Sequence, residues 1–162
     1  MKRLYRILLI LIIGAISQQS YAQERGQLNG SLDFVFGAGI AANGGVNIGV
    51  DYFITSKIAA APSYTHYFSS GIDYGELNLD AQYYFSLSKL QLYAIVGYTN
   101  LNVNGNVPLF GDVNESESGY NIGAGVYFPS GDKLSFSVQM KYASTLNGQA
   151  YYQAGLAYRF NK

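Results

Sequence analysis

Apolar and polar residues alternate along most of this chain. Near its end, Ala150, Tyr152, Ala154, Leu156, Tyr158 and Phe160 are separated by single residues of more polar or smaller character. A period of two is typical of a β-strand with two unlike faces. The same pattern recurs in eight segments, which span residues 28–40, 45–54, 57–68, 74–85, 89–99, 118–128, 133–144 and 150–162. The sequence therefore predicts an all-β fold of eight strands.

The length of these segments favours strands that cross a lipid bilayer. Each is about 10–13 residues long, which suits a tilted membrane-spanning strand and is roughly twice the usual length of a soluble strand. Several adjacent segments are joined by tight turns, which only antiparallel neighbours can have. We therefore expect a closed antiparallel eight-stranded up-and-down transmembrane β-barrel, in which no strand edge is left unpaired.

The connections differ systematically between the two ends of the expected barrel. "FITSK", "FSLSK" and "FPSGDK" are tight turns, each ending in a lysine. The other connections are more variable; one contains Asn147-Gly148, a type I′ hairpin signal. The longest, residues 100–118, is expected to be a surface loop carrying Asp112, Glu115 and Glu117. Short turns at one end and longer loops at the other are typical of outer-membrane barrels, and place the short turns in the periplasm.

Composition supports the membrane interpretation. Charged residues make up 12% of the chain, against about 25% in a typical soluble domain. Residues 1–22 combine a basic start, an apolar run and Ser20-Tyr21-Ala22, which predicts a signal peptide cleaved after Ala22, ahead of a barrel domain at 23–162. The apolar run is shorter than the roughly 18 residues of a membrane-spanning helix.

Other compositional features exclude several classes of protein. Loss of Lys2, Arg3 and Arg6 with the signal peptide leaves an acidic chain, which argues against nucleic-acid binding. The absence of cysteine excludes a disulfide framework and thiolate metal sites. The one histidine, His66, has the parity of the apolar face, and no strand offers it a nucleophile and an acid on the same face. We expect no catalytic, cofactor or metal site.

The polar face of the strands is expected to line the barrel interior. It is rich in glycine, tyrosine and amides, which suits the narrow interior of an eight-stranded barrel. Its charged residues form a predicted lumenal polar network of Asp33, Asp51, Asp80, Lys141 and Arg159. We expect Arg159 to pair with Asp51 or Asp33, and Lys141 to pair with Asp80, as a structural plug or as a gate in a small pore.

The chain resembles the small eight-stranded outer-membrane β-barrel family, which includes the transmembrane domain of OmpA and OmpX. The features that carry the resemblance are the N-terminal signal, the eight alternating strands, the "GDKLSFSVQMKY" turn-and-strand unit and an aromatic last strand, although Asn161 and Lys162 follow the final aromatic Phe160. The resemblance implies a monomer in the outer membrane of a double-membraned bacterium, in contact with outer-membrane lipids and lipopolysaccharide. It also implies insertion by the barrel-assembly machinery.

Three functions remain open at this level. The first is a non-enzymatic structural envelope protein that displays its surface loops. The second is a narrow porin-like channel for small solutes or ions. The third is a soluble lipocalin-like carrier, in which the apolar face would point inward.

Overall fold

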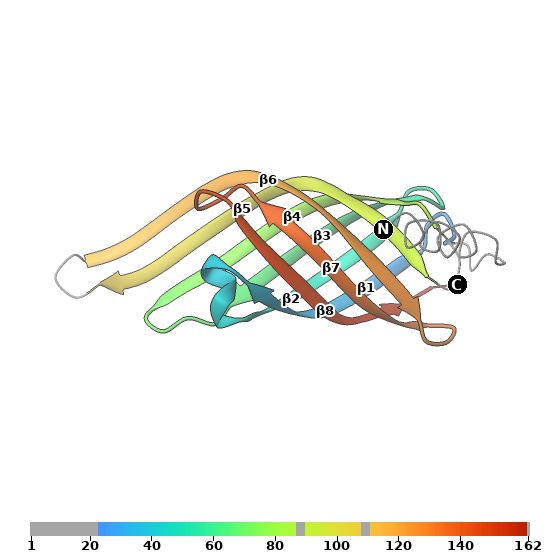
Figure 1. Ribbon diagram of the computed structural model, residues 1–162, viewed down its shortest axis with the longest axis horizontal. Helices are drawn as coiled ribbons and strands as arrows, with labels where there is room; N and C mark the ends of the chain where they lie inside the picture. The colour runs from blue at the N-terminus through green and yellow to red at the C-terminus, as the bar shows by residue number, and fades with distance from the viewer. Residues whose placement is uncertain (1–22, 87–89, 108–110, 162) are drawn as a thin grey trace, which may run out of the picture.

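The structure is a computed structural model that describes residues 23–86, 90–107 and 111–161 (Figure 1). The expected signal peptide and Lys89 lie outside these ranges. No helix in the described ranges is both long and apolar enough to span a membrane.

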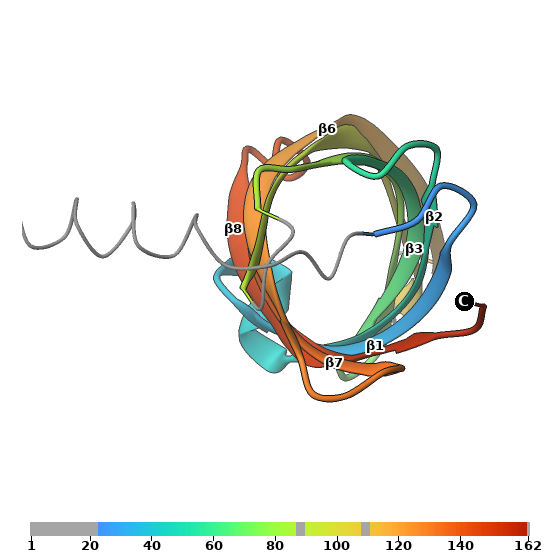
Figure 2. The ribbon, with the colours of Figure 1, turned by 90° about the vertical axis from the view of Figure 1, so that its right-hand side faces the viewer.

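Eight antiparallel strands close into a barrel, as the alternating pattern predicts. The elements are β1 (Leu28–Gly37), the short 3₁₀ helix η1 (Gly39–Asn43), β2 (Gly45–Phe53), β3 (Ile58–Tyr67), β4 (Ile72–Tyr84), β5 (Gln91–Val107), β6 (Gly111–Pro129), β7 (Leu134–Ala143) and β8 (Gln149–Arg159). Each strand pairs with the next, and β8 returns to β1 with Leu156 opposite Leu32. Figure 2 shows the resulting ring of strands along the barrel axis.

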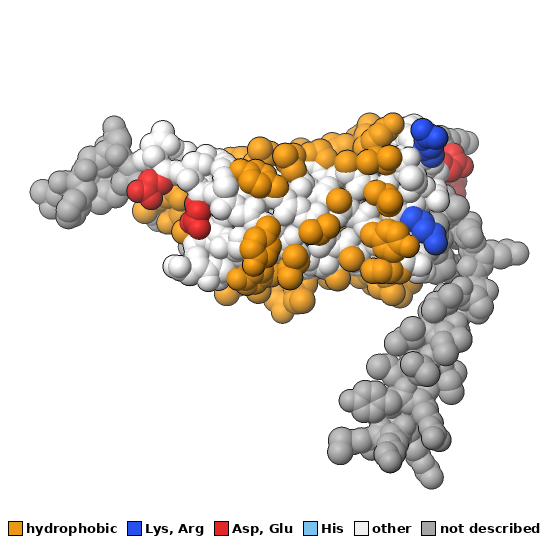
Figure 3. All heavy atoms as spheres, turned by 90° about the horizontal axis from the view of Figure 1, so that it is seen from above, with side chains coloured by type: hydrophobic (Ala, Val, Ile, Leu, Met, Phe, Trp, Pro, Cys, Tyr) orange, Lys and Arg blue, Asp and Glu red, His pale blue; other side chains and the backbone are white. Residues whose placement is uncertain are grey.

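The apolar face of the strands points outward. Phe34 is 67% exposed and Val96 is 61% exposed, although both lie in the middle of long strands. Exposed large apolar side chains come from all eight strands, and they form a broad belt on the face shown in Figure 3. A soluble carrier would bury this face, so the lipocalin-like alternative is wrong. The belt is the surface that an outer-membrane barrel presents to lipid.

The connection expected as a long loop is instead mostly strand. β5 and β6 pair with each other as far as Val107 and Gly111, and β5 keeps β4 as its other neighbour as far as Gly105. Residues 100–107 and 111–118 are therefore the strands of a long hairpin whose end projects past the barrel (Figure 1). Its outer face is a ladder of small polar side chains: the Asn100 amide donates to Ser116 Oγ at 2.9 Å and to Ser118 Oγ at 3.0 Å. Cross-strand hydrogen bonds of this kind can stabilise a sheet that lacks apolar alternation. The strands are predicted from apolar alternation, so the pattern does not indicate this hairpin.

Two further local expectations need correction. Residues 37–45 are expected to be two strand ends and a loop. They instead contain η1, in which Ala41 is fully buried. In the turn between β7 and β8, the two residues with left-handed backbone are Leu146 (φ 52°) and Asn147 (φ 63°), followed by Gly148 (φ 89°). The type I′ geometry is therefore shifted by one residue from the Asn147-Gly148 position that the sequence suggests.

Asn161, in the tail beyond the last aromatic residue, completes the seam of the barrel. The Leu28 amide donates to Asn161 Oδ1 at 2.7 Å, and Asn161 Nδ2 donates to the Gly26 carbonyl at 2.9 Å. The Phe160 amide donates to the Leu28 carbonyl at 2.9 Å. The side chain of Asn161 thus extends the β1–β8 ladder beyond the last paired strand residue.

Candidate functional site in the barrel interior

The interior is packed in three layers along the barrel axis. At the end that carries the hairpin and η1, buried apolar side chains form one cluster: Val35, Ala41, Tyr67, Leu101, Ala143 and Tyr151. At the end with the short turns, a second cluster consists of Phe53, Ala59, Tyr84, Tyr93, Ile95, Tyr127 and Ala157. Between the two clusters lie most of the buried polar and charged side chains.

An ion pair lies in the polar layer. Lys141 Nζ, on β7, is 2.6 Å from Asp80 Oδ2, on β4, and the two side chains are only 2% and 5% exposed. Asn121 Nδ2 donates to the other carboxylate oxygen of Asp80 at 3.0 Å. The predicted pairing of Lys141 with Asp80 is confirmed, and it is the one ion pair within the part of the chain that the structure describes.

The predicted pairing of Arg159 with Asp51 or Asp33 is wrong. Asp51 accepts hydrogen bonds from Tyr127 OH at 2.6 Å and from Gln82 Nε2 at 3.3 Å. The register of β8, β1 and β2 explains why Arg159 and Asp51 do not form an ion pair. Arg159 lies opposite Asn29 of β1, which lies opposite Asp51 of β2, so Arg159 and Asp51 are two strands apart, which is about 10 Å.

Asp33 is also satisfied by a neutral donor. It accepts from Ser137 Oγ at 2.5 Å. Its partner in the β1–β8 register is Gly155, four positions along β8 from Arg159, a separation of about 13 Å. Each of the two acids therefore has at least one neutral hydrogen-bond donor in the position expected for a cation.

Glu76 is a buried acid outside the network predicted from the sequence. It is completely buried, and its carboxylate accepts from Tyr151 OH at 2.8 Å, from Tyr67 OH at 3.0 Å and from Asn78 Nδ2 at 3.0 Å. Glu76 and Asp80 are separated by an even number of positions on β4, so the alternating pattern places both of them on the inward face. The three partners of Glu76 come from β3, β4 and β8, and only the closed barrel brings them together.

Inward glycines make room for the larger polar side chains. In the observed register, Gly97 lies opposite Asp80 and Gly123 lies opposite Lys141. Gly155 lies opposite Asp33, and a Cβ at Gly155 would lie 2.6 Å from the Asp33 Cα. Since such an approach is too close for any side chain, these glycines let a charged neighbour lean across the interior.

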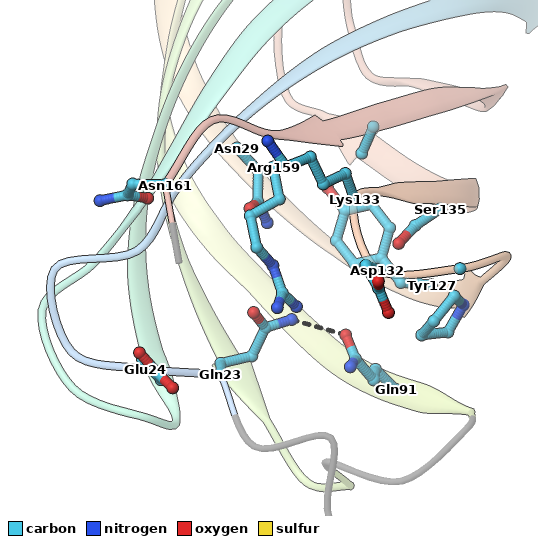
Figure 4. Close-up of a pocket in the computed structure, with 13 residues that line it drawn as sticks. Gln23, Glu24, Asn29, Gln91, Tyr127, Asp132, Lys133, Ser135, Arg159 and Asn161 are labelled. Carbon is cyan, nitrogen blue, oxygen red and sulfur yellow. Dashed lines mark hydrogen bonds between the residues drawn. The ribbon is translucent and has the colours of Figure 1, made fainter.

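The three layers leave little free volume in the middle of the barrel. A void of about 20 Å³ adjoins Asp51, Asp80 and Lys141, which is enough for about one water molecule. A much larger cavity, of about 690 Å³, opens at the short-turn end (Figure 4). The interior is therefore closed at mid-depth and hollow at one mouth.

The acidic residues expected on a surface loop have different surroundings. Glu115 and Glu117 are both exposed on the projecting part of β6. The carboxylate of Glu117 accepts from the Leu146 amide, with distances of 3.1 Å and 3.2 Å to its two oxygens, and so stabilises the left-handed turn between β7 and β8. Asp112 lies on the strand backbone of β6, and its side chain is outside the described part.

The geometry offers no constellation typical of catalysis or metal binding in the described ranges. No group of three or more histidine, cysteine, aspartate or glutamate side chains there could hold a metal ion. His66 lies outside the barrel and packs edge-on against Phe68, with ring centroids 6.3 Å apart. A closed barrel with an apolar belt and a plugged polar interior is an integral membrane protein of the outer-membrane class.

Comparison with known proteins agrees with this class. The sequence profile of the outer membrane protein beta-barrel domain family matches residues 7–160, and the chain belongs to that family. No curated protein matches the chain in sequence.

Solved structures similar to this chain have the same fold. The N-terminal β-barrel domain of Pseudomonas aeruginosa OprF aligns with a TM-score of 0.74 and 18% identity, over 85% of this chain and 100% of that domain. Ail, the attachment invasion locus protein of Yersinia pestis, aligns with a TM-score of 0.57 and 17% identity, over 83% and 97%. The outer membrane protein OprG from P. aeruginosa aligns with a TM-score of 0.58 and 14% identity, over 89% and 100%.

Proposed function

We propose that this protein is a non-enzymatic, non-conducting structural barrel of the bacterial outer membrane that presents the β5–β6 hairpin outside the cell. The observation that carries the proposal is the combination of a filled interior with one hairpin that projects well past the other strands (Figure 1). A barrel whose interior is closed acts most directly through the surface it exposes.

The hairpin has a free strand edge as well as an exposed face. β6 begins at Gly111, but its pairing with β7 begins only at Asn121. Between these points the second edge of β6 has no strand partner in the described ranges, apart from contacts with the turn after β7. Free backbone donors and acceptors on such an edge can pair with an extended segment of another protein, so this edge is the surface we assign to recognition.

The proposed surroundings follow from the outer surface. The apolar belt would contact outer-membrane lipids, and the hairpin end would meet lipopolysaccharide. The short-turn end carries Lys57 and Lys133, with the Lys133 ammonium 5.9 Å from the centre of the Tyr158 ring, as suits the interface region of a bilayer. We further propose insertion by the barrel-assembly machinery and a monomeric state, because the barrel body closes on itself.

Chemical labelling on intact cells tests the display of the hairpin. The chain contains no cysteine, so Asn104→Cys and Lys57→Cys each introduce one thiol, at exposed positions at opposite ends of the barrel. A membrane-impermeant maleimide is expected to label Asn104→Cys on intact cells, and Lys57→Cys only after the outer membrane is permeabilised. Labelling of Lys57→Cys on intact cells with a silent Asn104→Cys would reverse the proposed orientation and refute display of the hairpin.

Conductance separates the structural function from the channel alternative. Folded protein, verified by its heat-dependent mobility in SDS gels, is expected to give no discrete conductance steps in planar lipid bilayers, since the polar layer leaves room for about one water molecule. Regular steps from the same folded preparation would contradict the closed interior and favour a narrow channel.

A further inference from the structure

The cavity at the short-turn end has the composition of a binding site and is independent of the hairpin. This vestibule has a volume of about 690 Å³, and its lining includes Gln23, Asn29, Gln91, Tyr127, Pro129 and Arg159. Its volume falls within the range of about 300–1,000 Å³ that is usual for small-molecule sites. Neither the closed interior nor the projecting hairpin requires a hollow of this size.

One wall of the vestibule is a group of amides that satisfy one another. Gln23 Nε2 donates to Gln91 Oε1 at 2.6 Å, and Gln27 donates to Gln23 and, at 2.8 Å, to Asn29 Oδ1. These glutamine and asparagine side chains are almost completely buried. The wall is therefore fixed before any ligand arrives, and the amide nitrogens of Gln23 and Gln27 are already in use.

Arg159 supplies a charged donor to the vestibule. Its side chain is half-buried, and Figure 4 shows its guanidinium extending into the vestibule toward Gln23 and Gln91. No hydrogen bond or ion pair joins the guanidinium to any residue that the structure describes. A guanidinium that is partly withdrawn from water with its fork of N–H groups free is arranged to hold a planar oxyanion.

The other charged groups of the vestibule are less suited to this task. The Lys133 ammonium lies near the outward-facing Tyr158 ring, 5.9 Å from its centre. Glu24 and Asp132 are exposed, so water screens them. Among the charged residues that line the vestibule, Arg159 is therefore the half-buried cation.

The apolar part of the lining sets the character of the rest of the ligand. It includes Tyr127, Pro129 and Ala157, and Tyr127 belongs to the stacked aromatic group, with its ring centre 5.2 Å from that of Tyr93. An apolar or aromatic body would contact these side chains while its acid group reaches Arg159. We propose that the vestibule binds a small organic carboxylate with an apolar or aromatic body, held by Arg159.

Benzoate and benzamide test the proposal as a matched pair of probes, because they differ in the charged group and share the ring. The chain has four arginine positions, Arg3, Arg6, Arg25 and Arg159, so arginine-specific ¹⁵N labelling of the detergent-solubilised protein gives few Nε signals. Benzoate is expected to shift the Arg159 signal saturably, with a Kd of about 1–10 mM, and benzamide to bind at least about tenfold more weakly. Acetate, which lacks the ring, is expected to bind more weakly than benzoate.

Two variants complete the test. Arg159→Gln is expected to abolish benzoate binding, measured by calorimetry, while heat-dependent mobility in SDS gels stays unchanged because the guanidinium forms no hydrogen bond or ion pair with the described part of the chain. Arg25→Gln removes an exposed arginine at the same end and is expected to bind like the unaltered chain. Equal binding of benzamide, equal binding by Arg159→Gln, or no saturation with benzoate would each overturn the proposal. Tighter binding of inorganic phosphate than of benzoate would overturn the assignment to a carboxylate.

Discussion

Replacing Lys141 by alanine is expected to destabilise the folded barrel by about 3–5 kcal/mol, because Asp80 would remain as an unpaired charge in the interior. The two side chains are 2% and 5% exposed, so little water would be available to solvate the Asp80 carboxylate once the ammonium is gone. The measurement is the urea midpoint for refolding into lipid vesicles, followed by the mobility difference between folded and unfolded protein in SDS gels.

Two companion variants separate the ion pair from a general effect of losing a lysine. Lys57→Ala removes an exposed lysine at the short-turn end and is expected to change the midpoint little, as is usual for surface charges. Combining Lys141→Met with Asp80→Asn removes both charges and keeps similar volumes, and is expected to recover most of the stability. An unaltered midpoint for Lys141→Ala would show that the pair does not contribute to folding.

Replacing Glu76 by alanine is expected to cost about 2–5 kcal/mol, because it leaves the donors of Tyr67, Tyr151 and Asn78 without their acceptor in a completely buried site. Glu76→Gln keeps the size and one carbonyl oxygen, and the Tyr67 hydroxyl can accept from the new amide. We expect Glu76→Gln to lose at most about 1 kcal/mol in the same urea titration. Equal losses for the two variants would mean that the negative charge itself, rather than satisfied hydrogen bonding, stabilises this layer.

Together these two sites show how the barrel accommodates a surplus of interior acids. Asp33, Asp51, Asp80 and Glu76 are all buried, whereas Lys141 is the buried cation among the described residues. Hydroxyl and amide donors take the place of cations at three of the four acids. Because hydrogen bonds to a charged acceptor are stronger than those between neutral groups, a tyrosine- and amide-rich interior can hold carboxylates that have no ion-pair partner.

This substitution of donors for cations explains why one predicted ion pair is present and the other is absent. The sequence places Asp33, Asp51, Asp80, Lys141 and Arg159 on the inward face, and the structure agrees. Which of them meet depends on the stagger between strands, because a shift of two positions along one strand moves a side chain by about 7 Å. Lys141 reaches Asp80 across the interior, whereas Arg159 lies at the mouth, two strands from Asp51.

The projecting hairpin shows a second limit of the pattern. Residues 100–118 contain Asn and Ser at alternate positions where the other strands have apolar side chains. Because apolar alternation is missing here, the sequence pattern is typical of a loop. The pairing of these residues becomes visible only when Asn100 is seen opposite Ser118 and Asn102 opposite Ser116, where amide and hydroxyl groups can form hydrogen bonds across the strands.

The sequence by itself determined the strand number, the face that each residue takes and the closed-barrel class, because a period of two and low charge are local properties of the chain. Only the tertiary structure decided the ion-pair partners, the role of Glu76, the hairpin and the vestibule into which Arg159 extends. These features depend on the register between strands that are distant in sequence, and on the depth at which each side chain lies inside the closed barrel. Alternation along a single strand excludes register shifts of one residue, but it does not distinguish shifts of two residues and does not give the depth of a side chain.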